Sequence, residues 1–103
     1  MKLMTKAIKK QLPKLYSQEE IKDPKVIVKF FQPWGEWTWY GIEYDGEDTF
    51  FGYVMGWESE LGYFSLSELK SINGPMGLKI ERDLYFNPKR LSEIKDNNRE
   101  VKE

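Results

Sequence analysis

Apolar and polar residues alternate along the middle of the chain, as they do in β-strands that bury one face. The alternation predicts four strands, at residues 25–31, 37–44, 49–57 and 61–64. Asp45-Gly46, between the second and third of these strands, is a strong hairpin signal because glycine adopts positive φ at no steric cost. Short connections join antiparallel neighbours, so the pattern predicts an antiparallel meander of about four strands.

Three short helical segments are predicted to cover this meander. Thr5 has the residue type of an N-cap, and Pro13 ends the first helix because the residue before a proline avoids helical backbone angles. Residues 65–68 form a capping box that begins a second helix, which ends at residues 73–75. Pro88 is placed at the first position of a third helix. The predicted fold class is therefore α+β.

The length of 103 residues fits one domain, which we place at residues 1–94. Residues 95–103 are almost entirely charged or polar, which predicts a disordered tail. No apolar run approaches the roughly 18 residues of a membrane-spanning helix, so no membrane association is expected.

The chain contains neither histidine nor cysteine. This composition excludes disulfides, thiol catalysis, a Ser–His triad and a zinc site built on histidine or cysteine. Serine, lysine and carboxylate side chains occur in no spacing that activates one group by another. The sequence therefore predicts a protein that is not an enzyme and uses no cofactor.

The net charge of −1 hides a strong segregation of charge along the chain. Residues 1–18 contain five lysines and no acidic residue, whereas residues 30–69 contain eight acidic residues and no lysine or arginine. A near-neutral total argues against general affinity for nucleic acid, but local fields of this kind steer partners. The two segments are therefore candidates for binding surfaces of opposite sign.

Four carboxylates surround the predicted hairpin: Glu43, Asp45, Glu47 and Asp48. Oxygen ligands suit Mg²⁺ or Ca²⁺, and such a site would support a divalent-metal-dependent hydrolase. The spacing does not match an EF-hand loop, and aspartate and glycine are favoured in turns for local reasons. A solvated turn is the preferred interpretation, no metal site is predicted, and the hydrolase remains an alternative.

Aromatic side chains lie on both faces of the predicted sheet. Alternation puts Trp37 and Trp39 with Glu43 on one face, and Tyr40 with Tyr44 on the other. Core packing is the favoured interpretation, because aromatic rings bury the largest areas. Rings that stay exposed favour a protein partner, since Trp and Tyr are enriched at binding hot spots. The predicted partner-binding residues are Trp37, Trp39, Glu43, Asp45, Glu47, Asp48, Glu58 and Glu60.

The lysine-rich start of the chain offers an alternative function. Lys6, Lys9, Lys10 and Lys14 lie on or next to the first predicted helix and are suited to contact the phosphates of DNA or RNA. In this alternative, the acidic residues face away from the nucleic acid. The same lysines also fit a solubilising face over a short apolar stripe.

The number of apolar side chains available to cover the sheet leads to a prediction about association with another chain. Both faces of the predicted sheet are apolar, whereas the three helices offer few apolar side chains to cover them. A leftover apolar patch of more than a few hundred Å² usually marks an interface, so we predict a homo-oligomer or an obligate partner. In the alternative, a monomer is completed by side chains that wrap the second face, namely Leu78, Ile80, Leu84 and Phe86.

Several longer strings of residues point to a family. They are Trp37-Thr38-Trp39-Tyr40, Phe50-Phe51-Gly52-Tyr53-Val54, the run at residues 60–69 and Ile80-Glu81-Arg82-Asp83. Through these strings the chain resembles, over residues 3–94, a bacterial family described as domain of unknown function 2958. The resemblance implies a cytoplasmic protein carried by plasmids, integrative elements or phages, often near conjugation or anti-restriction genes. It brings no established activity, so no catalytic residue is carried over.

The predicted function is a non-catalytic accessory binding protein of such a mobile element. In this hypothesis the acidic, aromatic surface engages the basic groove of a host defence or replication protein, where its carboxylates imitate the spacing of phosphates. Direct nucleic-acid binding by the lysine-rich helix is the alternative that stays open.

Overall fold

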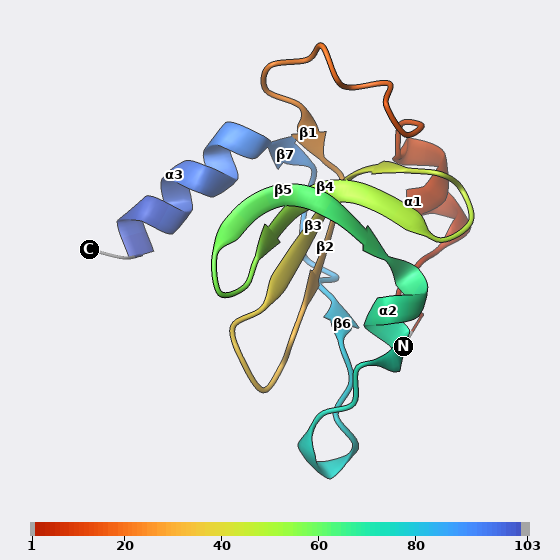
Figure 1. Ribbon diagram of the computed structural model, residues 1–103, viewed down its shortest axis with the longest axis vertical. Helices are drawn as coiled ribbons and strands as arrows, with labels where there is room; N and C mark the ends of the chain where they lie inside the picture. The colour runs from red at the N-terminus through yellow and green to blue at the C-terminus, as the bar shows by residue number, and fades with distance from the viewer. Residues whose placement is uncertain (1, 102–103) are drawn as a thin grey trace.

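A five-stranded antiparallel sheet forms the centre of the computed structural model, which describes residues 2–101 (Figure 1). The strands lie in the order β5 (Ser59–Ser65), β4 (Thr49–Met55), β3 (Thr38–Tyr44), β2 (Val28–Phe31) and β6 (Glu81–Arg82). Strands β2 to β5 form the predicted meander, so the α+β class is confirmed. The alternation does not predict β6, because two residues carry too little pattern.

A second, two-stranded sheet pairs β1 (Lys25–Val26) with β7 (Lys89–Arg90). The predicted strand at residues 25–31 is therefore wrong as a single strand, since its two halves belong to different sheets. The division falls at Ile27, whose N–H donates a hydrogen bond to the carbonyl of Gly41 at 2.9 Å. Alternation continues through this break, which is why the sequence does not reveal it.

The first two helices begin at the caps that the sequence predicts. Before α1 (Lys6–Gln11), the Thr5 hydroxyl accepts a hydrogen bond at 3.2 Å from the N–H three residues later. Before α2 (Leu66–Ser71), the Ser65 hydroxyl accepts the equivalent bond at 3.1 Å. A short 3₁₀ turn, η1 (Pro75–Gly77), follows α2. Both capping predictions are confirmed.

The third helix, α3 (Leu91–Val101), begins later than predicted. Pro88 is not its first residue, because β7 lies between them. Instead, the Asp23 carboxylate accepts hydrogen bonds from the N–H and the hydroxyl of Ser92, at 2.9 and 2.7 Å. The cap of this helix comes from a distant part of the chain, so local sequence does not indicate it.

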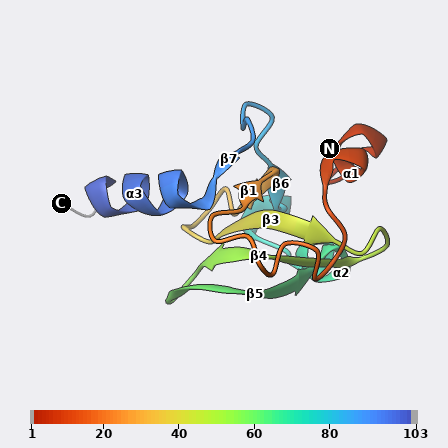
Figure 2. The same cartoon turned by 90° about the horizontal axis from the view of Figure 1, so that it is seen from above.

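The end of α3 also differs from the expectation. The helix passes residue 94, so regular structure does not stop at the predicted start of the tail. Residues 102–103 of that predicted tail lie outside the described residues. Figure 2 shows α3 extending away from the sheet. In the described part of the chain, no helix combines the length and apolar character needed to span a membrane.

A β-bulge in β3 changes which residues share a face of the sheet. The register of β3 against β4 shifts by one residue between Gly41 and Glu43. Ile42 and Glu43 consequently lie on the same face, and Tyr44 returns to the face of Trp39. The predicted faces of Glu43 and Tyr44 are therefore wrong, because strict alternation assumes a strand without a bulge.

The two faces of the sheet carry separate cores. The first face packs against α1 and α2, and its buried residues are Leu3, Leu12, Val28, Phe30, Trp39, Tyr44, Phe50, Phe64, Leu66, Leu69 and Ile80. The second face packs against β1 and α3, and its buried residues are Val26, Tyr40, Ile42, Tyr53, Leu91 and Ile94.

Cover on the second face is incomplete. Of the four residues considered as additional cover, Phe86 packs there and Ile80 joins the first core. Leu78 and Leu84 are exposed. The part of the second face over β4 and β5 therefore stays open within the described residues.

Candidate functional site

The acidic hairpin between β3 and β4 uses a carboxylate to form its turn. The Asp45 Oδ1 atom accepts hydrogen bonds from the N–H groups of Glu47, Asp48 and Thr49 at 2.8, 2.8 and 3.0 Å. These hydrogen bonds hold the pKa of the Asp45 carboxyl below its ordinary value, and those from Glu47 and Asp48 have the largest effects. Gly46 has a φ of 90°, which the predicted hairpin requires. The hairpin prediction is confirmed.

Asp48 connects this hairpin to α2. Its Oδ1 accepts a hydrogen bond from the Ser67 N–H, and its Oδ2 accepts one from the Ser67 hydroxyl, both at 2.8 Å. Two of the hairpin carboxylates are therefore engaged in local structure. Within residues 2–97, whose side chains the structure describes, no group of three or more His, Cys, Asp or Glu side chains is arranged to hold a metal ion.

Glu43 lies inside the protein, where it is 3% exposed. Its Oε1 accepts a hydrogen bond from the Tyr16 N–H and its Oε2 accepts one from the Gln18 N–H, both at 2.8 Å. These bonds offset the cost of burying the carboxylate, and they attach the loop at residues 16–18 to β3. The prediction that Glu43 belongs to an exposed acidic surface is therefore wrong.

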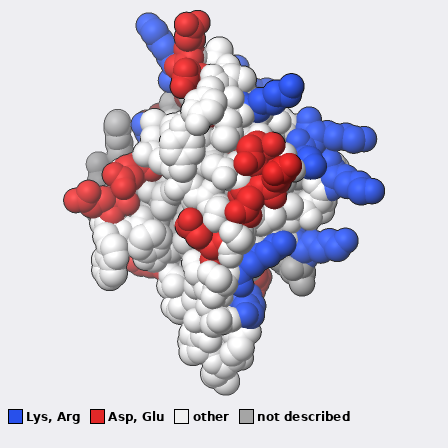
Figure 3. Space-filling view, turned by 45° about the vertical axis from the view of Figure 1, so that its right-hand side comes forward, with Lys and Arg blue, Asp and Glu red and all other residues white. Residues whose placement is uncertain are grey.

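The lysine-rich helix α1 lies beside the acidic hairpin. Lys6, Lys9, Lys10 and Lys14 are exposed. A Cβ atom at Gly46 would lie 3.6 Å from the Cε atom of Lys9, so the helix and the turn are neighbours. Figure 3 shows basic and acidic side chains next to one another on this side of the molecule. The expectation that the acidic residues face away from the lysines is wrong for the hairpin, whose carboxylates reduce the positive field of α1.

Tryptophan and carboxylate side chains gather at the opposite end of the sheet, at the β2–β3 and β4–β5 turns. Trp57 is 92% exposed, and its ring packs edge-on against that of Trp37 with the centroids 6.4 Å apart. The Trp37 ring lies 5.9 Å from that of Trp39. We call this surface the tryptophan–acid end and define it as Glu36, Trp37, Trp57, Glu58 and Glu60.

The predicted partner-binding residues do not form one surface. The three that lie at the tryptophan–acid end are Trp37, Glu58 and Glu60. The three that lie at the hairpin end are Asp45, Glu47 and Asp48. The remaining two, Trp39 and Glu43, are buried.

Two tryptophans show where the sequence-based assignment fails. Trp39 is 7% exposed in the first core, because β3 is an inner strand and its face is covered. The favoured interpretation of core packing is therefore confirmed for Trp39, and its inclusion among the partner-binding residues is wrong. Trp57 is missed because the alternation carries the third predicted strand through it, whereas β4 ends at Met55. The adjacent Gly56 is the signal that could have marked a turn there.

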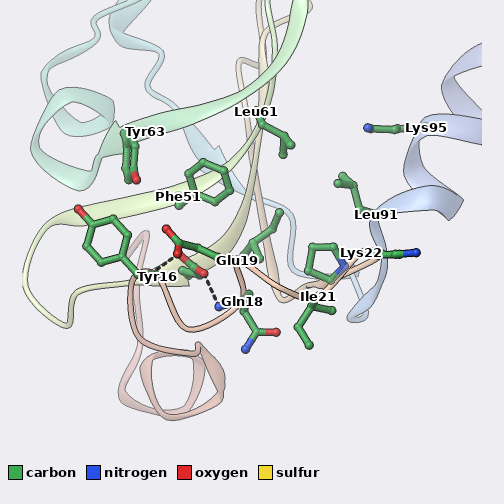
Figure 4. A pocket seen from close by; sticks show the side chains of 13 residues that line it. Tyr16, Gln18, Glu19, Ile21, Lys22, Phe51, Leu61, Tyr63, Leu91 and Lys95 are labelled. Atoms are coloured by element: carbon green, nitrogen blue, oxygen red, sulfur yellow. Dashed lines mark hydrogen bonds between the residues drawn. The ribbon is translucent and has the colours of Figure 1, made fainter.

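The open part of the second face forms a groove of about 470 Å³ between β5 and the loop that Glu43 holds (Figure 4). Three rings line one end of it: the Tyr16 and Tyr63 centroids are 6.5 Å apart, and those of Phe51 and Tyr63 are 5.1 Å apart. Partial desolvation raises the pKa of the Tyr63 hydroxyl, and a hydrogen bond with Tyr16 raises it by a smaller amount. The groove has the size of a ligand-binding or peptide-binding site.

Charge differs between the two ends of this groove. Glu43 and Glu19 lie close enough to the Tyr63 hydroxyl to act on it electrostatically. Lys22 and Lys95 lie toward the other end (Figure 4). The sequence does not predict the groove, because it depends on the bulge in β3 and on a loop in which Tyr16 has a φ of 69°. Neither feature leaves a periodic signal.

Comparison with known proteins places the chain in a family. No curated protein and no solved structure gives a significant match. The sequence profile described as "Protein of unknown function (DUF2958)" matches residues 3–102, which is nearly the whole chain. The chain therefore belongs to this family.

Proposed function

We propose that this chain is a non-catalytic binding domain that engages a basic protein partner through the tryptophan–acid end. The observation that carries the proposal is Trp57, which is 92% exposed although its ring packs edge-on against Trp37. A ring that is already held in place loses little conformational freedom on binding. Tryptophan is also among the residue types most enriched at binding hot spots.

Charge supports a basic partner at this end of the sheet. Glu36, Glu58 and Glu60 surround the two rings, and residues 30–69 contain no lysine or arginine. The hairpin carboxylates, by contrast, form the turn and lie beside the lysines of α1. The tryptophan–acid end therefore has the stronger negative field, and complementary charge speeds association and selects the partner.

The family resemblance supplies a setting for this proposal. It implies a bacterial plasmid, integrative element or phage, and a protein that acts in the cytoplasm. In that setting the tryptophan–acid end occupies the basic nucleic-acid groove of a host defence or replication protein, where Glu36, Glu58 and Glu60 take the places of phosphates. Binding in this groove counteracts the host protein because it excludes nucleic acid from the groove.

Direct nucleic-acid binding by α1 is the competing function. The exposure of Lys6, Lys9 and Lys10 favours it, and the neighbouring hairpin carboxylates oppose it. Such binding weakens steeply with salt, and it should weaken again when these three lysines are changed to alanine.

The test is a fluorescence-anisotropy titration at low salt with three labelled probes: an arginine-rich peptide, a glutamate-rich peptide of equal length and a short DNA duplex. We expect only the arginine-rich peptide to bind, and Trp57→Ala to weaken its binding by about tenfold or more. Tyr85→Ala is the matched control, because Tyr85 is 91% exposed on a different loop. An equal loss in both variants, or duplex binding that disappears with the lysine substitutions, would contradict the proposal.

A further inference from the structure

The two edges of the five-stranded sheet are built differently. β6, at one edge, has two residues, whereas β5, at the other edge, has seven, and no strand among the described residues pairs with its outer side. Proteins usually protect an edge with a short strand, a lysine, a proline or a bulge. β5 contains neither lysine nor proline, and its register with β4 is unbroken from end to end. Its one charged side chain is Glu60, so a single carboxylate protects this long edge.

The register identifies the main-chain groups that β5 presents outward. The Leu66 N–H donates a hydrogen bond to the carbonyl of Asp48 at 2.8 Å, which marks this position as a hydrogen-bonded pair. Hydrogen-bonded and non-hydrogen-bonded pairs alternate in an antiparallel ladder, so every second residue from Leu66 back to Glu60 bonds to β4. The N–H and C=O groups of Leu61 and Tyr63 therefore point away from the sheet.

From Glu60 to Tyr63, the side chains of this strand are apolar on the second face and acidic or absent on the first, where Phe64 alone enters the core. Leu61 and Tyr63 are 47% and 57% exposed, and both line the groove on the second face. On the first face Glu60 is exposed, and a Cβ atom at Gly62 would have no neighbour within 4 Å. An extended segment laid along β5 would thus meet an apolar groove on one side and an open, acidic strip on the other.

We propose that an extended basic segment of the partner adds to β5 as a further strand of the sheet. This inference rests on the proposed function and names the form in which the basic partner binds. Apolar side chains of the segment pack over Leu61 and Tyr63, and the alternate side chains, lysine or arginine, face Glu58 and Glu60. Main-chain hydrogen bonds at the edge supply affinity, and the alternation supplies specificity.

A second copy of this chain is a poorer occupant of the same edge. Pairing two β5 strands would bring Glu58 and Glu60 of both copies onto one continuous sheet. In a register that sets the two copies of Glu60 opposite each other, no lysine or arginine in residues 30–69 would offset them, and directly opposed like charges are destabilising. A basic segment has no such repulsion, and we therefore propose it, and not a second copy, as the occupant of this edge.

The first test follows individual amides of the isotope-labelled chain by hydrogen exchange, with a blocked peptide in which arginine alternates with valine. Strand addition should slow exchange at Leu61 and Tyr63, whose N–H groups point outward. The amides of Glu60 and Gly62, which already bond to β4, should change much less. A peptide of the same composition, with arginines and valines in separate blocks, is the control because it has the same charge without the alternation.

The second test uses two substitutions at one position. Leu61→Ala and Leu61→Pro both remove the leucine side chain, but only proline also removes the outward N–H. An edge strand tolerates proline at a position whose N–H points away from the sheet. We expect Leu61→Pro to weaken binding of the alternating peptide by about tenfold more than Leu61→Ala does. Should the proline variant fail to fold, hydrogen exchange in the unsubstituted chain decides alone.

The outcomes separate this inference from the proposed function. Equal binding of the two peptides without protection at Leu61 and Tyr63 would overturn strand addition, while loss of binding in Trp57→Ala would still support the proposed function. If Trp57→Ala also left binding unchanged, both would fail. Sedimentation equilibrium that showed a dimer whose formation blocks the peptide would replace the basic segment with a second copy.

Discussion

The two faces of the sheet carry similar types of residue, but other elements of the chain cover the first face more completely than the second. Both carry aromatic and aliphatic side chains, yet Phe30 and Phe50 on the first face are 0% exposed, whereas Leu61 and Tyr63 on the second face stay about half exposed. The first face has the N-terminal segment, α1 and α2 packed against it, and the second has β1, Phe86, the start of α3 and the loop that Glu43 holds. A chain of this length buries a limited share of its surface, so closing one face leaves part of the other available to a partner.

The largest expected effect comes from two neighbouring residues that point to opposite faces. Phe50 stacks between Tyr44 and Phe64, with ring centroids 4.4 and 5.0 Å away, whereas Phe51 is half-buried at the groove. Phe50→Ala should lower the free energy of unfolding by about 4 kcal/mol. Phe51→Ala should lower it by about 1–2 kcal/mol, since its ring loses fewer contacts. Urea unfolding measures both, and equal losses would show that the two faces are packed equally well.

A pair of cross-strand glycines compares the interior of the sheet with its open edge. A Cβ atom at Gly52 would overlap the carbonyl oxygen of Tyr40, so the backbone would have to move, whereas a Cβ atom at Gly62 meets nothing. Gly52→Ala should lower the free energy of unfolding by about 3 kcal/mol. Gly62→Ala should be neutral or raise it by about 0.5 kcal/mol, because alanine restricts the unfolded chain. Similar losses in thermal unfolding would mean that the edge at Gly62 is already covered.

Glu43 decides how far the second face is covered, because it holds the loop that forms one wall of the groove. Glu43→Gln keeps the size of the side chain but turns an NH₂ group toward one of the two N–H donors. The expected loss is about 1–3 kcal/mol of unfolding free energy, with faster hydrogen exchange at Tyr16 and Gln18. Glu47→Gln, at an exposed position in the same hairpin, is the control and should change stability by less than about 0.5 kcal/mol. Unchanged exchange at Tyr16 would show that other contacts hold the loop.

Features that depend on nearby residues could be predicted from the sequence. The caps at Thr5 and Ser65 and the turn at Asp45 each use donors within four positions along the chain. The Asp23 carboxylate that caps α3 lies 69 residues from Ser92, so no local pattern points to it. The same reason applies to β6, whose two residues gain their structure from pairing with β2.

In the candidate site, too, local patterns could be predicted from the sequence and long-range packing could not. Within β3, alternation correctly separates two faces up to Gly41, but it cannot show which face is covered or that the register shifts before Glu43. Trp39 and Glu43 are therefore assigned to a surface from which packing removes them. Glu58 and Glu60 are assigned correctly to the surface, since they lie in or beside a turn at the edge of the sheet. The predicted homo-oligomer stays a prediction that the open groove makes worth measuring.

The smallest expected effect concerns the β3–β4 hairpin, which belongs to neither face. The N–H groups of Glu47 and Asp48 lower the pKa of the Asp45 carboxyl relative to the unfolded chain. Such a carboxylate stabilises the fold above its unfolded pKa, about 3.9, and this contribution is lost as the pH falls through the lower folded pKa. Because Asp45 is exposed, the contribution should stay below about 1 kcal/mol.

Asp45→Asn keeps an oxygen acceptor for the turn but removes the titration, so it isolates the effect of charge. The stability difference between the unsubstituted chain and this variant should be largest near neutral pH and shrink as the pH falls below about 3.9. Asp23, whose pKa is lowered by its hydrogen bonds with Ser92, still titrates in both proteins and gives them a common acid-induced loss. Urea unfolding at a series of pH values measures the difference. A difference that persisted in strong acid would mean that the shape of the aspartate side chain, and not its charge, supports the hairpin beside α1.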